Sequence, residues 1–459
     1  MVSNISDRCF IVRKAIVIGL DCAPPRLLYD EFKNELDILG ELVGQGTRYI
    51  LRSSHPPITI PAWAVMATGK TPGELGLYGF RHRKPGSYGD IYIANSRSIK
   101  EPPIWVDLAR QGYWNIVVGV PPSYPPKPIR GYLISDFITP DHTKQYTWPI
   151  SLKNEIEKLY GSYIFDVLYR SEEKDRIIKE LWEMTIQHFN VLNYLIKNKK
   201  WDFIWFVEIG VDRVHHAFWK YWDKEHPKYE SGNKYEHVIP EYYKLIDKLI
   251  GDLLRNVPKD TLIFIASDHG AKAMKGAFAI NQWLEENGYL RFKKKPEKPC
   301  TDLDPGLVDW EHTKAWGWGG YYSRIFINIK GREPKGIVPR EKVPDLIMEL
   351  KNELRKINGP NGKPWKNLVY TPDELYPVVK GDAPDIFLYI DDLNWRAAGT
   401  VGWDSPYLEE NDKGPDEAVH DWYGVFTIYD PEGTIESRDR GVIDIVNVKE
   451  LMLKMIIKQ

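Results

Sequence analysis

The stretch KAIVIGLD, residues 14–21, decides the fold class of this chain. It is a continuous apolar run rich in β-branched residues, and it ends in an acid, Asp21. Strands that are buried on both faces of a parallel sheet have this pattern, whereas a strand with one solvated face alternates apolar and polar residues. We therefore interpret 14–21 as a central parallel strand that presents a carboxylate at its carboxyl end.

Three later stretches repeat this theme, and helical segments lie between them. NIVVGVP (115–121), WDFIWFVEIGVD (201–212) and TLIFIASDHG (261–270) are continuous hydrophobic runs, and the last two contain acids at their ends. Residues 171–198 begin with Ser171 and acids, as a helix start should. The alternation predicts an α/β fold with a mostly parallel central sheet, helices on both faces and ligands beyond the carboxyl ends of the strands.

Residues 295–410 differ in character from the rest of the chain. They contain many Pro and Gly turns, the aromatic stretch AWGWGGYY and one helix-like segment. We read them as a smaller α+β insertion or cap. The predicted organisation is a catalytic core made of residues 1–294 and 411–459, with the insertion at 295–410.

Composition excludes several classes of partner. Lys and Arg number 62 and Asp and Glu 64, a formal net charge of -2, which provides no electrostatic attraction for a nucleic acid polymer or an anionic membrane. Three cysteines cannot build a disulfide framework, and no apolar run is long enough to cross a bilayer. We expect a cytoplasmic protein with no membrane or nucleic acid partner, and its oligomeric state stays open.

Carboxylates and imidazoles gather at the predicted strand ends. In VDRVHHAFW, Asp212 and His216 stand four residues apart, so a helical turn brings both towards one point while His215 faces elsewhere. In SDHG, an acid and an imidazole precede Gly270, which permits a sharp exit from the strand. A metal that activates a nucleophile needs carboxylates and imidazoles at strand ends. The candidate metal ligands are Asp21, Asp212, His216, Asp268, His269 and His420.

A candidate nucleophile lies in TIPAWAVMATG. Thr59 stands near the start of a predicted helix, where backbone N–H groups and the helix dipole favour an anion. A free threonine is a poor nucleophile at neutral pH, and coordination to a metal is one of the few ways to ionise its hydroxyl. Thr59 is therefore a candidate for both roles, nucleophile and metal ligand.

Taken in order, VIGLD, TIPAW with TGKTPGELG, EIGVDRVHH, SDHG and a late histidine resemble the alkaline phosphatase superfamily. The resemblance is to its type I phosphodiesterase/nucleotide pyrophosphatase branch and the phosphohydrolase/phosphomutase-like relatives, and it covers nearly the whole chain. It implies two divalent metal ions, usually zinc and sometimes manganese, and a phosphorylated Thr59. It further implies that Asp21, Thr59, Asp268 and His269 bind one metal and that Asp212, His216 and His420 bind the other.

A charge count tests this implication. Asp21, Asp212 and Asp268 place -3 in one pocket, which would repel a phosphate. Two divalent cations add +4 and leave +1 before Thr59 ionises. In such two-metal sites the cations stabilise both the attacking and the leaving oxygen of an in-line displacement.

The expected function is that of a two-metal phosphoric ester hydrolase, similar to phosphodiesterases and nucleotide pyrophosphatases, acting on a small phosphate ester or diester. A phosphomutase of the same superfamily is the nearest alternative. A metal-binding scaffold without catalysis is a third, against which the intact Thr59 argues.

Candidate substrate contacts follow the nucleophile segment. Where the related pyrophosphatases offer an asparagine to the phosphate, this chain has Leu75-Gly76 and then Phe80. Arg81 and His82, followed by Arg83, are candidates to hold phosphate oxygens, because guanidinium groups match that geometry. A solvated loop is the equal alternative.

One further motif matches a spacing that is typical of a different class of enzyme. Cys22, Pro24 and Arg26 have the C-x-P-x-R spacing of sulfatases, in which the cysteine is oxidised to a catalytic aldehyde. That cysteine belongs to the nucleophile segment, and here Thr59 fills that position. We therefore interpret Cys22 as a small buried side chain at the exit of a strand.

Overall fold

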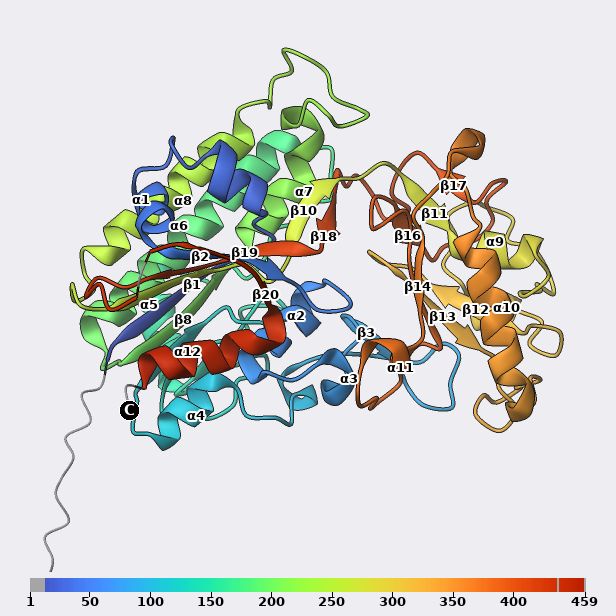
Figure 1. Ribbon diagram of the computed structural model, residues 1–459, viewed down its shortest axis with the longest axis horizontal. Coiled ribbons are helices and arrows are strands. Elements are labelled where there is room, and N and C mark those ends of the chain that lie inside the picture. The colour runs from blue at the N-terminus through green and yellow to red at the C-terminus, as the bar shows by residue number, and fades with distance from the viewer. Residues whose placement is uncertain (1–12, 436, 458–459) are drawn as a thin grey trace, which may run out of the picture.

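The computed structural model describes residues 13–435 and 437–457, and a nine-stranded sheet lies at its centre (Figure 1). The strand order is β20-β2-β19-β9-β1-β8-β5-β6-β7. All six residues of β1 are buried, and β1 runs parallel to both of its neighbours, β8 and β9. The predicted central parallel strand is therefore confirmed. The strands are β1 (Ala15–Leu20), β2 (Thr47–Arg52), β5 (Asn115–Val118), β6 (Gly131–Ile134), β7 (Thr147–Trp148), β8 (Phe203–Glu208), β9 (Leu262–Ala266), β19 (Tyr423–Tyr429) and β20 (Asp439–Asp444).

Most neighbouring strands of this sheet are parallel, and β19 is an informative exception. The parallel pairs are β1 with β8, β1 with β9, β5 with β8, β5 with β6 and β2 with β20. β19 runs antiparallel to β9 and β2, and β7 runs antiparallel to β6. Because of that direction, the chain enters β19 at the carboxyl end of β9. Residues that precede β19 therefore lie beside the acids that follow β1 and β9.

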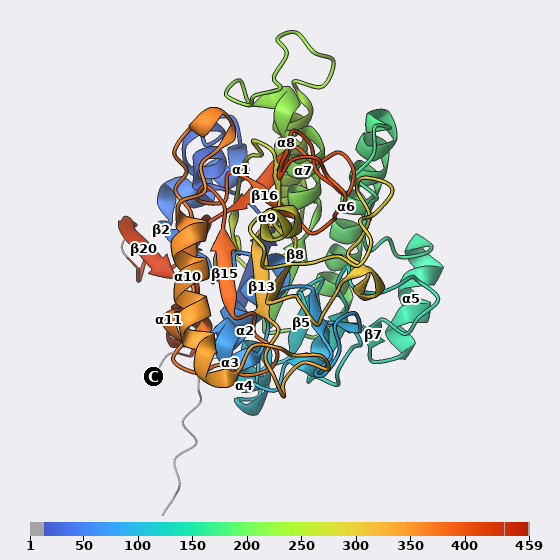
Figure 2. The same cartoon turned by 90° about the vertical axis from the view of Figure 1, so that its right-hand side faces the viewer.

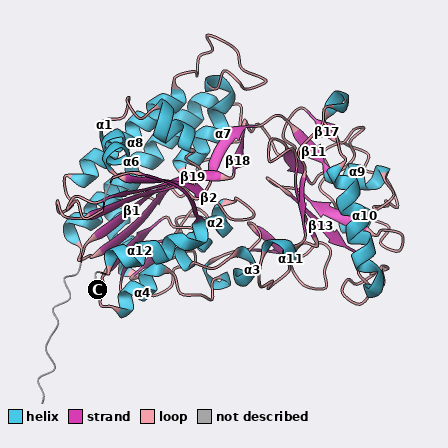
Figure 3. Cartoon of the chain, viewed as in Figure 1, coloured by secondary structure: helices cyan, strands magenta, loops and turns pink. Residues whose placement is uncertain are grey.

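Helices cover both faces of the sheet, which confirms the predicted fold class (Figures 1 and 3). Ile16 and Ile18 of β1 join the hydrophobic cluster of one face, whereas Ala15 and Val17 join the cluster of the other. The first face carries α1 (Asp37–Gln45), α5 (Ser151–Tyr160), α6 (Lys174–Asn198), α7 (Gly210–Trp222) and α8 (Val238–Leu254). The second face carries α2 (Thr59–Thr68), α4 (Ile104–Arg110) and α12 (Val448–Ile456).

A smaller lobe with its own hydrophobic cluster stands beside the core, and it faces the viewer in Figure 2. Its main sheet is antiparallel, with the order β12-β13-β15-β14, and α9 and α10 pack against it. β11 and α9 precede residue 295, so packing favours an earlier start for the insertion, and the boundary at 295 stays a prediction. The elements are β11 (Ala277–Ala279), α9 (Ile280–Glu286), β12 (Ala315–Trp318), β13 (Ser323–Ile327), α10 (Val343–Arg355), β14 (Leu368–Tyr370), α11 (Pro372–Leu375), β15 (Ile386–Tyr389), β16 (Arg396–Ala398) and β17 (Tyr407–Leu408).

Two short antiparallel strands join the core to this lobe. β10 (Gly270–Ala273) leaves the core after β9, and β18 (Ala418–Asp421) returns to it before β19. In this pair Ala271 stands opposite His420. The pairing therefore sets the late histidine next to the SDHG turn, at the edge of the core that faces the lobe.

A second connection runs through the segment that follows α2. It forms α3 (Pro72–Leu75), β3 (Arg81–Arg83) and β4 (Ile91–Ile93). Arg83 is buried and forms ion pairs with Glu333 and Asp382 of the lobe, at 3.0 and 2.6 Å.

None of the helices in the described part of the chain combines the length and the apolar character that a membrane span requires.

Candidate active site

Two buried carboxylates stand side by side at the carboxyl ends of β1 and β9. Asp21 directly follows β1, Asp268 follows β9, and both are fully buried. Trp63 of α2 donates its indole N–H to Oδ2 of Asp21 at 2.6 Å. The indole reaches the strand because Gly19 has no side chain: a Cβ there would lie 2.8 Å from the Trp63 ring. Oδ2 of Asp21 therefore accepts a hydrogen bond from Trp63, whereas Oδ1 has no hydrogen-bond partner among the described residues.

His269 brings the threonine and these two carboxylates together. Its Nε2 lies 3.1 Å from Oδ2 of Asp268, 3.8 Å from Oδ1 of Asp21 and 3.4 Å from Oγ1 of Thr59. Thr59 is the first residue of α2 and is buried. The structure therefore gathers all four residues that the resemblance assigns to the first metal.

Asp212, His216 and His420 form a second, equally compact group. Asp212 and His216 lie one turn apart on α7, and Oδ1 of Asp212 is 3.2 Å from Nε2 of His216. Nε2 of His420 is 3.6 Å from the same oxygen and 3.3 Å from Nε2 of His216. Ligands about 2.0–2.1 Å from a tetrahedral zinc ion stand about 3.3–3.4 Å apart, so the three separations suit such an ion.

Each of the three aspartates keeps one buried oxygen without a hydrogen-bond partner among the described residues. These atoms are Oδ1 of Asp21, Oδ1 of Asp212 and Oδ2 of Asp268. Burying an ionised oxygen without compensation is costly, and buried charges are normally paired or bound to metals. The free oxygens all face the imidazoles of these two groups. The residues therefore fit divalent cations.

Burial and the neighbouring charges shift the pKa values of the three acids. Burial, followed by repulsion from Asp212, raises the pKa of Asp21 well above its ordinary value. Burial and the charge of Asp21 do the same to the pKa of Asp268. Burial would also raise the pKa of Asp212, but His216 and Arg213 hold it well below its usual range. Two acids thus resist ionisation in the absence of cations, and a nearby cation reverses that effect.

The pKa values of the three imidazoles also shift in different directions. Burial lowers the pKa of His269 to about 4, and burial together with His269 lowers that of His420 well below its ordinary value. Both rings are therefore neutral near pH 7, the form that binds metals. Burial opposes protonation of His216 as well, but the carboxylates of Asp416 and Asp212 raise its pKa well above the usual range.

Two contacts that the sequence analysis missed orient these imidazoles. Oδ1 of Asp416 lies 2.7 Å from Nδ1 of His216, and the carbonyl oxygen of Pro57 lies 2.8 Å from Nδ1 of His420. Histidines that bind metals usually donate their second N–H to such acceptors. Asp416 stands four positions before His420, but its contact with α7 has no local signal in the sequence.

The lobe contributes an aromatic side chain from AWGWGGYY, whose contact with the site histidines the sequence did not predict. Tyr321 stacks on His420 with ring centroids 3.7 Å apart, and its hydroxyl lies 3.1 Å from Nε2 of His216. Arg396 of β16 lies over the same phenol ring at 4.8 Å, and its Nε and Nη1 atoms are buried without a hydrogen-bond partner among the described residues. The lobe therefore closes one side of the site.

Arg81 and His82 lie apart from this assembly. His82 is buried, accepts the backbone N–H of Tyr78 at 2.9 Å and stacks on Tyr92. Arg81 is exposed on β3. Among the described residues, no hydrogen bond or ion pair links either of them to the metal-site acids and imidazoles, so their role in substrate binding stays a prediction.

Comparisons show that the chain is similar to known proteins in sequence and in fold. The family model described as type I phosphodiesterase/nucleotide pyrophosphatase matches residues 15–416. No curated protein matches the chain.

Two solved structures illustrate the similarity of the fold. Phosphonoacetate hydrolase from Sinorhizobium meliloti 1021, in complex with phosphonoformate, is 15% identical, has a TM-score of 0.63 and covers 99% of this chain and 98% of its own. An inactive variant of murine ectonucleotide pyrophosphatase/phosphodiesterase 5, in complex with AMP, is 12% identical, with a TM-score of 0.54 and coverage of 97% and 95%. At such identities the likeness concerns the fold.

Proposed function

This chain belongs to the type I phosphodiesterase/nucleotide pyrophosphatase family and is a phosphoester hydrolase, and from that premise we propose a two-metal mechanism with a phosphorylated Thr59. One divalent metal ion is held by Asp21, Thr59, Asp268 and His269. The other is held by Asp212, His216 and His420. Zinc is the preferred ion and manganese the alternative, because the donors are carboxylate, hydroxyl and imidazole groups.

The main support for this proposal is that three carboxylates with unbonded oxygens lie close to the proposed nucleophile. Three buried carboxylate oxygens have no hydrogen-bond partner among the described residues, and they come from β1, α7 and the SDHG turn. They meet three imidazoles, and one of these, His269, lies beside the hydroxyl of Thr59. Segments far apart in the chain would not meet in this way for packing alone, since each unpaired charge destabilises the fold.

Thr59 is well placed to attack a bound phosphoryl group. It begins α2, no side chain of the described residues caps the start of that helix, and the first-turn N–H groups and the helix dipole favour an anion there. Divalent cations supply the positive charge that lowers the pKa of a neighbouring hydroxyl and stabilises charge on phosphoryl oxygens. Oγ1 of Thr59 forms a bond to phosphorus while the bond to the leaving alcohol breaks, and that alcohol takes up a proton.

A water molecule completes the cycle. It attacks phosphorus, the bond to Oγ1 of Thr59 breaks, and the threonine regains its proton. Asp416 and the Pro57 carbonyl keep the rings of His216 and His420 in one orientation through both steps. Tyr321 from the lobe limits the access of bulk water on that side.

The substrate is a small phosphate ester, with a diester favoured over a monoester. The lobe brings an aromatic side chain, Tyr321, against the metal-site histidines, and such a surface suits a substrate with a second, larger substituent. The similar solved structures contain AMP and phosphonoformate, which are also small phosphorus compounds.

Elemental analysis and an ester panel test the proposal. The metal content of the purified protein is measured first, and chelated protein is then reloaded with zinc or manganese. Each form is assayed with bis-p-nitrophenyl phosphate, p-nitrophenyl phosphate and phosphonoacetate. Two metals per chain and metal-dependent turnover, fastest with the diester, are expected. Full turnover in chelated protein, or no turnover of any of the three by protein that holds two metals, would contradict it.

A further inference from the structure

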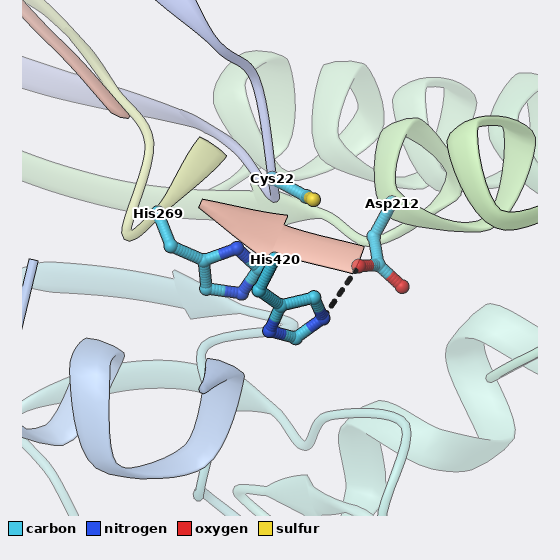
Figure 4. A group of neighbouring side chains, drawn as sticks. All are labelled: Cys22, Asp212, His269 and His420. Atoms are coloured by element: carbon cyan, nitrogen blue, oxygen red, sulfur yellow. Dashed lines mark ion pairs between the residues drawn. The ribbon is translucent and has the colours of Figure 1, made fainter. Parts of the chain in front are cut away.

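We propose that the thiol of Cys22 is an additional ligand of the metal centre, an inference that rests on the proposed two-metal function. The Sγ atom of Cys22, a carboxylate oxygen of Asp212 and ring nitrogens of His269 and His420 all lie within 4.8 Å of one another (Figure 4). All four residues are buried. The thiol therefore stands among donors that the two-metal site already requires.

The thiol of Cys22 lies close to ligands of both proposed metals. Asp212 and His420 belong to the group of the second metal, whereas His269 belongs to the group of the first. Oδ1 of Asp212 is buried and has no hydrogen-bond partner among the described residues, so a free acceptor faces the same space as the thiol. Zinc takes thiolate at about 2.3 Å and imidazole at about 2.0–2.1 Å, in tetrahedral sets. The group of Asp212, His216 and His420 supplies three donors, so a thiolate beside Asp212 and His420 would be the fourth.

The backbone aims the thiol at this space. Cys22 has a φ of 64°, in the left-handed region where glycine is the usual residue. Its N–H donates to Oδ1 of Asp268 at 3.3 Å, and the N–H of Ala23 donates to Oγ of Ser267 at 2.8 Å. The turn after β1 is thus held by a proposed metal ligand and by that ligand's neighbour. From this turn the Cys22 side chain enters the space beside Asp212, His269 and His420.

The rest of the C-x-P-x-R motif takes no part in this chemistry. Arg26 forms ion pairs with Glu31 at 2.6 Å and Asp223 at 3.2 Å, on the surface of the core. Thr59, not Cys22, lies at the start of α2, where the nucleophile is expected. The cysteine is therefore better explained as a donor to metal than as the precursor of an aldehyde.

A purely structural role makes a different prediction. The thiol lies 3.3 Å from the carbonyl oxygen of Gly270 and can donate a hydrogen bond to it. When a metal binds, the thiol instead loses its proton to the solvent and the sulfur forms a bond to the cation, so that the charge balances. Thiolate favours soft ions, and it would shift the preference of the centre towards zinc or cadmium and away from manganese.

Cobalt substitution distinguishes these roles. Chelated protein is loaded with Co²⁺, bound cobalt is counted, and the near-ultraviolet spectrum is examined for a thiolate-to-cobalt charge-transfer band. The double variant Cys9→Ser/Cys300→Ser keeps Cys22 as its only cysteine, since the chain has three. Cys22→Gly removes the thiol and suits the positive φ, and Cys22→Ser keeps a hydrogen-bond donor to Gly270.

The band is expected in the parent and in the double variant, and it is expected to vanish in Cys22→Gly and Cys22→Ser. Zinc affinity should fall about tenfold or more in both single variants, the scale seen when a partner of a ligand is lost. If the parent binds two cobalt ions without the band, Cys22 is not a ligand and the two-metal proposal stands. If the parent binds no cobalt, both proposals fall together.

Discussion

Oδ1 of Asp416 lies 2.7 Å from Nδ1 of His216, and both side chains are completely buried. Nε2 of the same ring faces Asp212 at 3.2 Å, so the two nitrogens have separate partners. Burial alone would raise the pKa of Asp416, but His216 and Arg170 lower it to about 2, and the carboxylate is charged at every pH of interest. A charged acceptor behind a ligand fixes its orientation and increases its basicity.

We therefore expect Asp416→Asn to weaken zinc binding by about 10- to 100-fold, the usual cost of losing such a partner. Competition with a chromophoric chelator measures the affinity. Asp412→Asn is the matched control, because Asp412 is also buried but accepts a hydrogen bond from Thr400 instead. Equal zinc affinities in Asp416→Asn and the parent would show that the contact does not support the ligand.

Replacing Thr59 with Ala should reduce turnover of bis-p-nitrophenyl phosphate by about 10³-fold or more, because the group that attacks phosphorus is removed. Metal content should stay near that of the parent, since carboxylates and imidazoles supply the other ligands. Thr68→Ala serves as the control: Thr68 ends the same helix, and its hydroxyl donates to the Ala64 carbonyl. Parental turnover in Thr59→Ala would refute the covalent role.

Trp63→Phe should destabilise the protein more than Trp205→Phe does. Both rings are fully buried, but the Trp63 indole donates to Asp21 at 2.6 Å, whereas the indole N–H of Trp205 has no partner among the described residues. Leaving one more oxygen of Asp21 unpaired costs about 1–3 kcal/mol of unfolding free energy. Urea unfolding of both chelated variants gives the comparison, and equal losses would contradict the importance of this hydrogen bond.

We expect the contribution of His188 to the stability of the fold to depend on pH. Its Nδ1 lies 3.1 Å from Oε2 of Glu208 and its Nε2 lies 2.6 Å from the Ile164 carbonyl, so both nitrogens face acceptors. Burial lowers the pKa of His188, but the Glu208 carboxylate and the hydrogen bond to the Ile164 carbonyl act together to raise it above the ordinary value of 6.5. When the pKa of a histidine is higher in the folded than in the unfolded protein, its protonation stabilises the fold. This stabilisation is fully present below the unfolded pKa of about 6.5, and it disappears as the pH rises through the folded pKa.

The unfolding free energy of the parent minus that of His188→Gln should therefore shrink as the pH rises above about 6.5. Subtracting the variant removes the titration of the other groups. His226→Gln is the control, because burial lowers the pKa of His226 to about 4 and the ring stays neutral over this range. A difference for His188→Gln that does not change with pH would show that the ring is not protonated.

Removing the metals should lower the melting temperature reversibly. Chelation leaves Asp21, Asp212 and Asp268 buried together without cations. A ligand that binds only the folded state at 100 times its dissociation constant stabilises by about 2.7 kcal/mol per site. Differential scanning calorimetry with a chelator, followed by addition of zinc, measures the effect. An unchanged melting temperature would count against cations in this pocket.

Much of the fold could be predicted from local patterns. The buried runs at 115–121, 201–212 and 261–270 contain β5, β8 and β9, and the helix expected over 171–198 contains α6. Burial on both faces leaves a continuous apolar run, and an amphipathic helix leaves a 3.6-residue period, so both signals can be read within one segment. The approach of Asp212 and His216 is equally local, because both lie on one face of one helix.

By itself, then, the sequence determined the α/β class, the acids at the strand ends and the threonine at the start of a helix, since each depends on neighbours along the chain. Only the tertiary structure decided that Asp416 supports His216, 200 positions away, and that Tyr321 closes over His420. It also decided that the thiol of Cys22 faces the metal-site acids and imidazoles rather than the remainder of its own motif. Contacts between distant segments follow from how the sheet and the lobe pack, and no period or spacing in the sequence records them.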